Sequence, residues 1–280
     1  MPKVTKKTLN CRGRLVSLDT PVVMGILNVT PDSFFAGSRI SLDETVDVAQ
    51  RMLTDGATFL DIGGYSTRPG AADISPVEEA DRVLPVIEAI LDSFPDALIS
   101  VDTFRSSVAK QAVESGAVLV NDVAGGTLDP AMFETVTALG VPYVLMHMRG
   151  TPATMQSMTT YQNLVTDVID ELAIRLAELR SFGQKDIIID PGFGFAKTPA
   201  QNFLLLSNLD SLRQFDEPLL VGLSRKTTIW KTLDISADKA LNGTTVLNTV
   251  ALTKGASILR VHDVREAVEA IKLTQHLKFF

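Results

Sequence analysis

Eight short apolar runs, separated by segments of helical periodicity, constrain the fold of this chain more than any other feature. Each run is rich in Val, Ile and Leu without polar alternation, which is typical of parallel strands covered on both faces. The runs span 22–27, 58–62, 98–101, 118–120, 143–146, 187–189, 219–222 and 258–261. Eight strand–helix alternations predict an α/β fold, the (β/α)8 TIM barrel. The alternative is an open doubly wound sheet, but no glycine fingerprint follows the first run.

Capping signals mark the helices between these runs. Residues 41–44 and 75–78 have the pattern of capping boxes. Residues 129–130 and 198–201 likewise predict helix starts. Glycines at 56, 116, 140 and 183 follow the apolar-periodic stretches, as expected where helices end. The longest helix is predicted over 163–181, with one apolar face formed by Leu164, Val168, Leu172, Leu176 and Leu179.

A single domain is expected. The 280 residues contain no linker rich in Pro, Gly or Ser, and α/β barrels of this size are commonly single domains. Apolar and polar residues alternate over 8–18, on both sides of Arg12-Gly13, and this pattern predicts a short hairpin. We therefore expect an N-terminal hairpin extension over 1–20, which closes the bottom of a barrel formed by 21–280.

Charge and cysteine content exclude several classes of protein. The net charge of −7 argues against a nucleic-acid partner, because binding a phosphate backbone requires a basic surface. The one cysteine, Cys11, permits no intrachain disulfide and fits a reducing compartment. No apolar run approaches the ~18 residues that span a bilayer, and the basic N-terminal segment lacks the apolar part of a secretory signal. We expect a cytoplasmic protein that binds no membrane.

Residues able to bind or react follow nearly every apolar run. They are Asn28, Asp61, Asp102, Asn121, His147, Asp190, Ser224-Arg225-Lys226, and Arg260 with His262. In a barrel these positions converge on one mouth, at the C-terminal ends of the strands. The sequence therefore predicts an active site built from strand ends.

One subset suits a flat heterocycle with several N–H groups. Asp102, Asn121 and Asp190 supply acceptors and an amide, and buried carboxylates require donors to pair with. Lys226 would donate to the far edge of such a ring. The competing interpretation is that one of the aspartates only caps a helix.

A second subset suits a phosphate group with a hard cation. Arginine, histidine and hydroxyl donors bind phosphate, and an Asn oxygen beside them is a plausible Mg²⁺ ligand. The members are Asn28, Thr67, Arg68, Arg260 and His262. The planar face of Arg260 could also stack on a heterocycle. Alternatively, Arg68 is a solvated loop residue and His262 accompanies a helix N-cap at Asp263.

Two long loops, 30–40 and 63–74, have the composition of lids at a barrel mouth, although surface excursions would have the same composition. His147 is equally consistent with a functional residue and with a satisfied, partly buried histidine. No Ser/His/Asp triad, zinc-type Cys/His spacing or Walker loop is present.

The ordered motifs resemble the dihydropteroate synthase family. They are Asn-Val-Thr-Pro-Asp-Ser-Phe at 28–34, Asp-Ile-Gly-Gly-Tyr-Ser-Thr-Arg-Pro-Gly at 61–70, Val-Asp-Thr at 101–103, Asn-Asp at 121–122, Asp-Pro-Gly-Phe-Gly-Phe at 190–195, Ser-Arg-Lys at 224–226 and Arg-Val-His-Asp at 260–263. The resemblance runs from about residue 22 to about residue 273.

The resemblance implies a transferase of folate biosynthesis that condenses 6-hydroxymethyl-7,8-dihydropterin pyrophosphate with 4-aminobenzoate, assisted by Mg²⁺. Its catalytic residues would be Asp102, Lys226, Arg260 and His262. The pterin would contact Asp102, Asn121, Asp190, Lys226 and Arg260. Pyrophosphate would contact Asn28, Thr67, Arg68, Arg260 and His262, with Asn28 also the metal ligand. Aminobenzoate would contact Phe34, Thr67, Pro69, Phe195, Lys226 and Thr227. Such enzymes are usually homodimers and are targets of sulfonamides.

The chain departs from the family pattern in two loops. Tyr65 stands where the second loop commonly has an acid, and Phe35-Ala36-Gly37 stands where the first commonly reads Ser-Asp-Gly. A role for a carboxylate at these positions does not carry over. The rival interpretations are a pterin-dependent methyltransferase barrel acting with a corrinoid partner, and a silent pterin-binding protein. The phosphate-type cluster favours the synthase.

Overall fold

The computed structural model describes residues 6–29, 42–67 and 73–277 of the chain. Its main sheet has eight parallel strands in the order β8-β7-β6-β5-β4-β3-β10-β9. A bridge between Ile189 and Leu219 joins the two outer strands, so the sheet closes into a barrel. The strands are β3 (Val22–Asn28), β4 (Phe59–Gly63), β5 (Leu98–Asp102), β6 (Leu119–Asp122), β7 (Tyr143–Met146), β8 (Ile187–Asp190), β9 (Leu220–Val221) and β10 (Ile258–Val261). All eight predicted strands and the barrel are confirmed.

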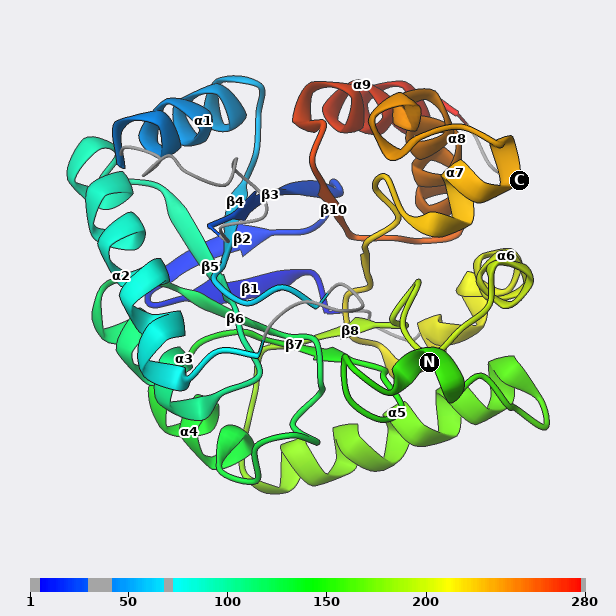
Figure 1. Cartoon of the computed structure of the whole chain (residues 1–280), viewed down its shortest axis with the longest axis horizontal. Helices are drawn as coiled ribbons and strands as arrows, with labels where there is room; N and C mark the ends of the chain where they lie inside the picture. Colours follow the sequence, from blue (N-terminus) through cyan, green and yellow to red (C-terminus); the bar gives the residue numbers. More distant parts are fainter. Residues whose placement is uncertain (1–5, 30–41, 68–72, 278–280) are drawn as a thin grey trace.

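Helices surround the strands (Figure 1). They are α1 (Leu42–Thr54), α2 (Pro76–Ser93), α3 (Ser106–Glu114), α4 (Met132–Leu139), α5 (Leu164–Ser181), α6 (Pro199–Ser207), α7 (Thr227–Leu233), α8 (Leu241–Thr253) and α9 (Val264–Gln275). The five predicted apolar residues of α5 are all buried. None of the helices in the described ranges combines the length and the apolar character needed to cross a bilayer.

Two of the predicted helix starts follow the expected chemistry. Ser75 accepts a hydrogen bond from the backbone of Glu78, and Thr198 forms a reciprocal capping box with Gln201. The start predicted at 129–130 is about two residues early, because α4 begins at Met132 with Ala131 before it. One oxygen of the Asp129 carboxylate accepts the backbone N–H of Ala131, directly before α4, and the other accepts that of Ser106, the first residue of α3. The box at 41–44 includes Ser41, which lies outside the described residues.

The N-terminal hairpin pairs β1 (Thr8–Cys11) with β2 (Arg14–Ser17), as predicted. Leu9, Cys11 and Leu18 are buried in one apolar cluster with the N-terminal parts of several barrel strands, including Met24 and Phe59. The hairpin therefore closes the bottom of the barrel and leaves the C-terminal mouth as the accessible end. Burial raises the pKa of the Cys11 thiol to about 12, so this cysteine is a core residue and no thiolate forms near neutral pH.

Candidate active site

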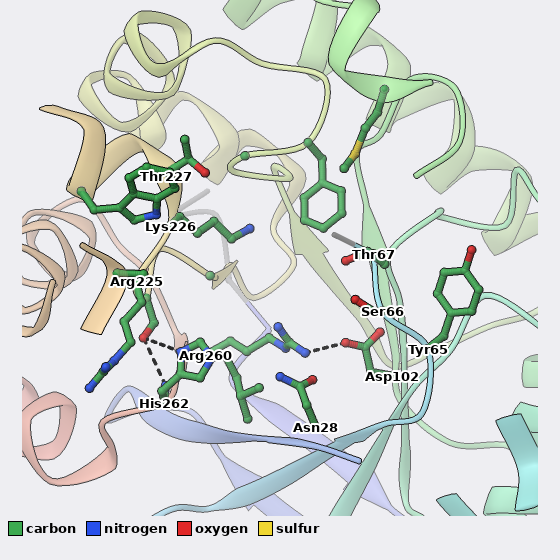
Figure 2. A pocket seen from close by; sticks show the side chains of 18 of the residues that line it. Asn28, Tyr65, Ser66, Thr67, Asp102, Arg225, Lys226, Thr227, Arg260 and His262 are labelled. Atoms are coloured by element: carbon green, nitrogen blue, oxygen red, sulfur yellow. Dashed lines mark hydrogen bonds and ion pairs between the residues drawn. The ribbon is translucent and has the colours of Figure 1, made fainter. Parts of the chain in front are cut away.

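A cavity of about 690 Å³ opens at the mouth of the barrel. Its lining draws on the ends of β3, β5 and β10 and on the loops that follow β4, β7, β8 and β9 (Figure 2). Eight of the predicted site residues line it: Asn28, Thr67, Asp102, Phe195, Lys226, Thr227, Arg260 and His262. The strand-end positions thus converge on one place, as the barrel requires.

Arg260 joins two carboxylates at the inner end of this cavity. Its Nε donates to Oδ2 of Asp61 at 2.6 Å, and its Nη2 donates to Oδ2 of Asp102. Figure 2 shows the guanidinium reaching toward Asp102, with Asn28 beside the pair. Burial opposes the charge on Arg260, but the two carboxylates raise its pKa above the usual value. The guanidinium therefore remains a cation inside the barrel.

Asp102 titrates near neutral pH. Burial raises its pKa to about 7; Arg260 opposes this rise, whereas Asp61, Glu79 and Asp122 add to it. The ion pair favours the carboxylate form, and a change in the charge of a bound ligand would shift this balance.

Asp61 holds the inner end of the site together, a role that the sequence argument did not assign. Its side chain is completely buried and accepts hydrogen bonds from the Ser100 hydroxyl and from the Asn121 amide, the latter at 2.9 Å, besides Arg260. Asn121 is correspondingly buried and does not line the cavity. The signal for Asp61 was its position at the end of the second apolar run, where it matches the other strand-end residues.

Asp190 is also buried and absent from the cavity lining. Its Oδ1 accepts the backbone N–H of Gly192 at 2.7 Å. Burial raises its pKa, and Lys226 opposes the rise. The Lys226 ammonium donates to the carbonyl of Phe193 and lies 4.6 Å from the ring centroid of Phe195. Burial lowers the pKa of Lys226 to about 8.

His262 is oriented by Ser224 at the outer side of the cavity. The Ser224 Oγ accepts the backbone N–H of His262 at 3.2 Å and lies 3.0 Å from the ring Nδ1. If the serine hydroxyl donates to Nδ1, the proton of the neutral ring lies on Nε2, which can then donate to an anion. Asp263 accepts hydrogen bonds from Arg225 and makes no side-chain cap of α9. The alternative that His262 serves an N-cap is therefore not supported.

Replacing Ser224 with Ala is expected to raise the KM for the phosphate-bearing substrate about fivefold. The loss of one hydrogen bond, worth about 1 kcal/mol, leaves the His262 ring free to turn. Steady-state kinetics at a saturating concentration of the second substrate would measure it. The exposed Ser107→Ala variant serves as the control, and equal KM values for the two variants would contradict the assignment.

His147 does not line the cavity. Its ring lies buried between Glu171, 3.0 Å from Nε2, and the ammonium of Lys197, 2.9 Å from Nδ1. Burial, followed by the charge of Lys197, lowers the pKa of His147 to about 4. The satisfied-histidine interpretation is therefore confirmed.

This depressed pKa predicts a loss of stability in mild acid. Between pH 6.5 and pH 4.5 the unfolded chain binds a proton at His147 that the folded chain does not, so the contribution of His147 to the free energy of unfolding falls as the pH falls. The loss attributable to His147 should be about 2–3 kcal/mol. Urea unfolding of the wild type and of His147→Asn at the two pH values would measure it as a difference between the two proteins, because the raised pKa values of Asp102 and Asp122 act in the opposite direction in both. A variant with the wild-type pH dependence would refute this account.

Several lining residues were not assigned roles from the sequence. Tyr65 packs edge-on against Phe104, with ring centroids 5.0 Å apart, and the Arg105 guanidinium lies 5.2 Å from its ring. Others include Met155, Gln156, Trp230 and Lys231. Helical spacing could have indicated Trp230, which lies one turn beyond Lys226. No sequence signal marked Met155 or Gln156.

Three predicted site residues, Phe34, Arg68 and Pro69, lie outside the described residues. The same holds for Ala36, for the whole of the proposed lid 30–40 and for 68–72 of the second loop. The predictions for these positions stay predictions.

Comparisons with known proteins identify the family of this chain. The family described as "Pterin binding enzyme" matches residues 24–262. The dihydropteroate synthase of Escherichia coli (strain K12) is 41% identical over 270 residues, which cover 95% of each protein. A crystal structure of the Yersinia pestis dihydropteroate synthase in complex with a sulfonamide drug superposes with a TM-score of 0.91 at 42% identity, covering 96% of this chain and 98% of that one. The Xanthomonas albilineans dihydropteroate synthase with 4-aminobenzoic acid has a TM-score of 0.90 at 38% identity, covering 98% of this chain and 100% of that one.

The match of the pterin-binding enzyme family over 24–262 places this closed barrel in the class of pterin-binding enzymes. Within the class, the relatives that align over nearly the whole length are synthases. The chain belongs to the dihydropteroate synthase family.

Proposed function

We propose that this chain condenses 6-hydroxymethyl-7,8-dihydropterin pyrophosphate with 4-aminobenzoate, giving 7,8-dihydropteroate and pyrophosphate in folate biosynthesis. The observation that carries the proposal is the cavity itself. One side of the cavity presents the ion pair of Asp102 and Arg260. A second side presents Ser224 and His262, which are suited to bind an anion. A third side presents the Phe195 ring with Lys226 beside it. A polar ring, a pyrophosphate and an aryl acid require these three environments.

We assign the pterin to the inner end of the cavity. The carboxylates of Asp102 and Asp190 would accept hydrogen bonds from N–H groups of the ring, and the Asn121 amide could both donate and accept. Lys226 would donate to the far edge of the ring. A ligand there would replace the bond between Lys226 and the Phe193 carbonyl and part of the pairing of Arg260. The freed face of Arg260 would then stack on the ring.

We assign the pyrophosphate to Arg260, His262 and Thr67, with Arg68 as a further donor, and Mg²⁺ to Asn28. The residues present fit such a cation. A Cβ built on Gly63 would make ordinary contacts with both the Asn28 amide oxygen, at 3.5 Å, and Cβ of Asp102, at 3.4 Å, so two oxygen-bearing side chains lie on either side of this glycine at the cavity. No group of three or more His, Cys, Asp or Glu in the described ranges could hold a metal, which fits Mg²⁺ bound by one or two side chains and substrate phosphates. When bound, Mg²⁺ would neutralise charge that develops on the leaving pyrophosphate.

We assign 4-aminobenzoate to Phe195, Thr67 and the Lys226-Thr227 backbone, with Pro69 and Phe34, which lie outside the described residues, as further predicted contacts. The Phe195 ring would stack on the aryl ring, and the first N–H groups of α7 would meet its carboxylate. Sulfonamides, as mimics of the aryl acid, would compete at this place. We also expect a cytoplasmic homodimer.

The geometry suits an ionisation-first reaction. The C–O bond to pyrophosphate breaks and its electron pair leaves with the phosphate, where Arg260 and His262 stabilise the charge. The carbocation at the pterin methylene lies near the Asp102 carboxylate. The neutral amine of aminobenzoate then forms the C–N bond and releases a proton, so no strong base is needed. Positional isotope exchange in the pyrophosphate without aminobenzoate tests this order, and absence of exchange together with a steep dependence of rate on amine nucleophilicity would refute it.

A turnover assay tests the function. The protein is incubated with dihydropterin pyrophosphate, 4-aminobenzoate and Mg²⁺, and dihydropteroate and pyrophosphate are measured. A methyltransferase would instead methylate a corrinoid protein, and a silent binding protein would give no product. Absence of product under all conditions would refute the proposal.

Replacing Asp190 with Asn is expected to weaken pterin binding by about 1–3 kcal/mol, because the substitution removes a charged acceptor. The variant keeps an oxygen for the Gly192 N–H, so the local turn should survive. Isothermal titration with a dihydropterin would measure the change, and near-normal affinity would refute the assignment.

A further inference from the structure

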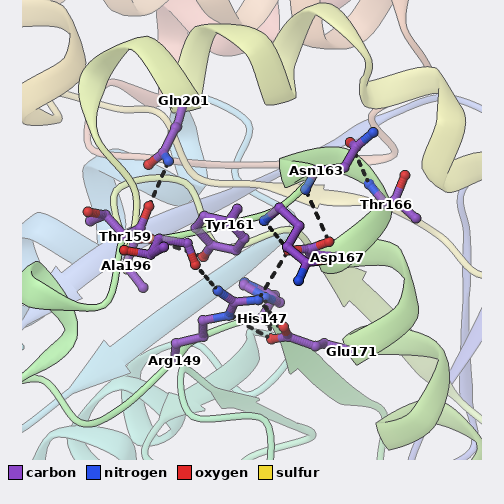
Figure 3. Close-up of polar contacts among 12 residues, drawn as sticks. His147, Arg149, Thr159, Tyr161, Asn163, Thr166, Asp167, Glu171, Ala196 and Gln201 are labelled. Carbon is purple, nitrogen blue, oxygen red and sulfur yellow. Dashed lines mark hydrogen bonds and ion pairs between the residues drawn. The ribbon is translucent and has the colours of Figure 1, made fainter.

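A polar cluster beside the cavity, with two buried members and three partly buried ones, has no part in the reaction described above. We call it the His147 cluster, and it consists of His147, Arg149, Tyr161, Glu171 and Lys197. Figure 3 shows Arg149 and Tyr161 beside His147, with Glu171 on the far side of the ring. Arg149 donates to Glu171 at 3.0 Å and stacks 3.9 Å from the Tyr161 ring centroid. The cluster lies between the loop after β7 and the loop after β8.

Lys197 is the member that reaches the active-site loop. Its side chain is 4% exposed, and its ammonium meets three acceptors: His147 Nδ1 at 2.9 Å, Gly192 O at 3.0 Å and Phe195 O at 3.1 Å. An ammonium has three N–H donors, so its hydrogen-bonding capacity is filled. When Lys197 is protonated, His147 accepts at Nδ1 and carries its proton at Nε2, where it donates to Glu171.

The two carbonyls that Lys197 holds bracket segment 192–195. Within it, Gly192 donates its N–H to the Asp190 carboxylate, and Phe195 provides the aromatic wall of the cavity. Gly192 has φ 69°, and a Cβ there would come within 1.9 Å of the His147 carbonyl. Segment 192–195 thus packs against the backbone of His147 on one side and accepts hydrogen bonds from the Lys197 ammonium on the other.

The same cluster fixes the loop after β7, which also lines the cavity. Tyr161 donates to the Ala196 carbonyl at 3.0 Å, and Arg149 donates to the Thr160 carbonyl at 2.6 Å. Gln201 of α6 donates to the Thr159 carbonyl at 2.8 Å. The loops that carry Gln156 and Phe195 are therefore held to one another through these contacts.

We propose that Lys197 is a positioning residue of this active site. Its buried ammonium, braced by His147, sets the place of the Phe195 ring and of the Asp190 carboxylate. Neither Lys197 nor His147 lines the cavity. The inference rests on the proposed function, because its main readout is the KM for 4-aminobenzoate.

The first test is Lys197→Met, which keeps the length of the side chain and removes the donors. We expect the KM for aminobenzoate to rise about tenfold and the Kd for dihydropterin to rise about threefold, with a smaller change in kcat. Lys254→Met, at a lysine paired with Asp210 3.4 Å away on the surface, is the control. A role limited to stability would lower the melting temperature and the active fraction but leave both constants unchanged.

The second test uses two substitutions of His147 that separate its ring nitrogens. His147→Asn places an oxygen near Nδ1 and retains an acceptor for Lys197, whereas His147→Gln places an amide near Nε2 and retains the donor to Glu171. We expect the Asn variant to keep a KM within about twofold of wild type and the Gln variant to approach Lys197→Met. This pair carries the test even if Lys197→Met does not fold.

The outcomes are distinguishable. An inactive wild-type protein would refute the proposed function. An active wild-type protein with unchanged KM and Kd in Lys197→Met would overturn the positioning role alone. A KM for His147→Asn as high as that for His147→Gln would also overturn the positioning role. In the double variant Lys197→Met/His147→Gln, a KM no higher than in Lys197→Met would support the inference that His147 acts on the site through Lys197.

Discussion

Replacing Arg260 with Gln is expected to lower kcat/KM by about two to three orders of magnitude. Removing one preorganised donor from developing negative charge typically has an effect of this size. Arg260 is the cation that Asp61 and Asp102 hold beside the phosphate-type cluster, and its carboxylate partners keep it charged. Steady-state kinetics with pterin pyrophosphate would measure the loss.

Arg260→Lys distinguishes charge from geometry. A lysine keeps the charge but lacks the planar fork that reaches both carboxylates and could stack on the pterin. We expect it to recover only part of the lost activity. Melting temperatures of both variants control for instability, and a Gln variant within tenfold of wild type would contradict the role assigned to Arg260.

Replacing Asp61 with Ala is expected to lower the free energy of unfolding by about 3–5 kcal/mol, because removing one partner of a buried ion pair leaves its charge uncompensated. Ser100 and Asn121 also lose their acceptor. Chemical denaturation at pH 7 would measure the change.

Asp55→Ala is the matched control. Asp55 also pairs with an arginine, Arg265, at 3.0 Å, but the arginine side chain is 69% exposed. Exposed pairs contribute about 0–1 kcal/mol, so this variant should remain near wild type. Equal losses for Asp61→Ala and Asp55→Ala would show that burial of the Asp61–Arg260 pair has no special importance.

Much of the site was predictable because a parallel barrel converts strand ends into neighbours. Asn28, Asp102 and Arg260 are far apart in the chain, yet each ends or nearly ends an apolar run. The failures occurred where a side chain serves an element other than its own. Asp129 was predicted to begin the helix that follows it, but its carboxylate also accepts a backbone N–H at the start of α3. Asp61 received no role because its partners come from three other strands.

The sequence by itself determined the barrel, its hairpin plug and the set of residues at its mouth. Apolar runs and capping residues act locally, and their spacing is visible along the chain. Only the tertiary structure decided which polar groups face the cavity and which lie buried beside it. Asn121 and Asp190 belong to the buried set, and Lys197 binds carbonyls that precede it by two and five residues as well as a histidine fifty residues away. The physical reason is that a buried charge takes whichever partners the packed chain brings within hydrogen-bond distance, and no local pattern specifies them.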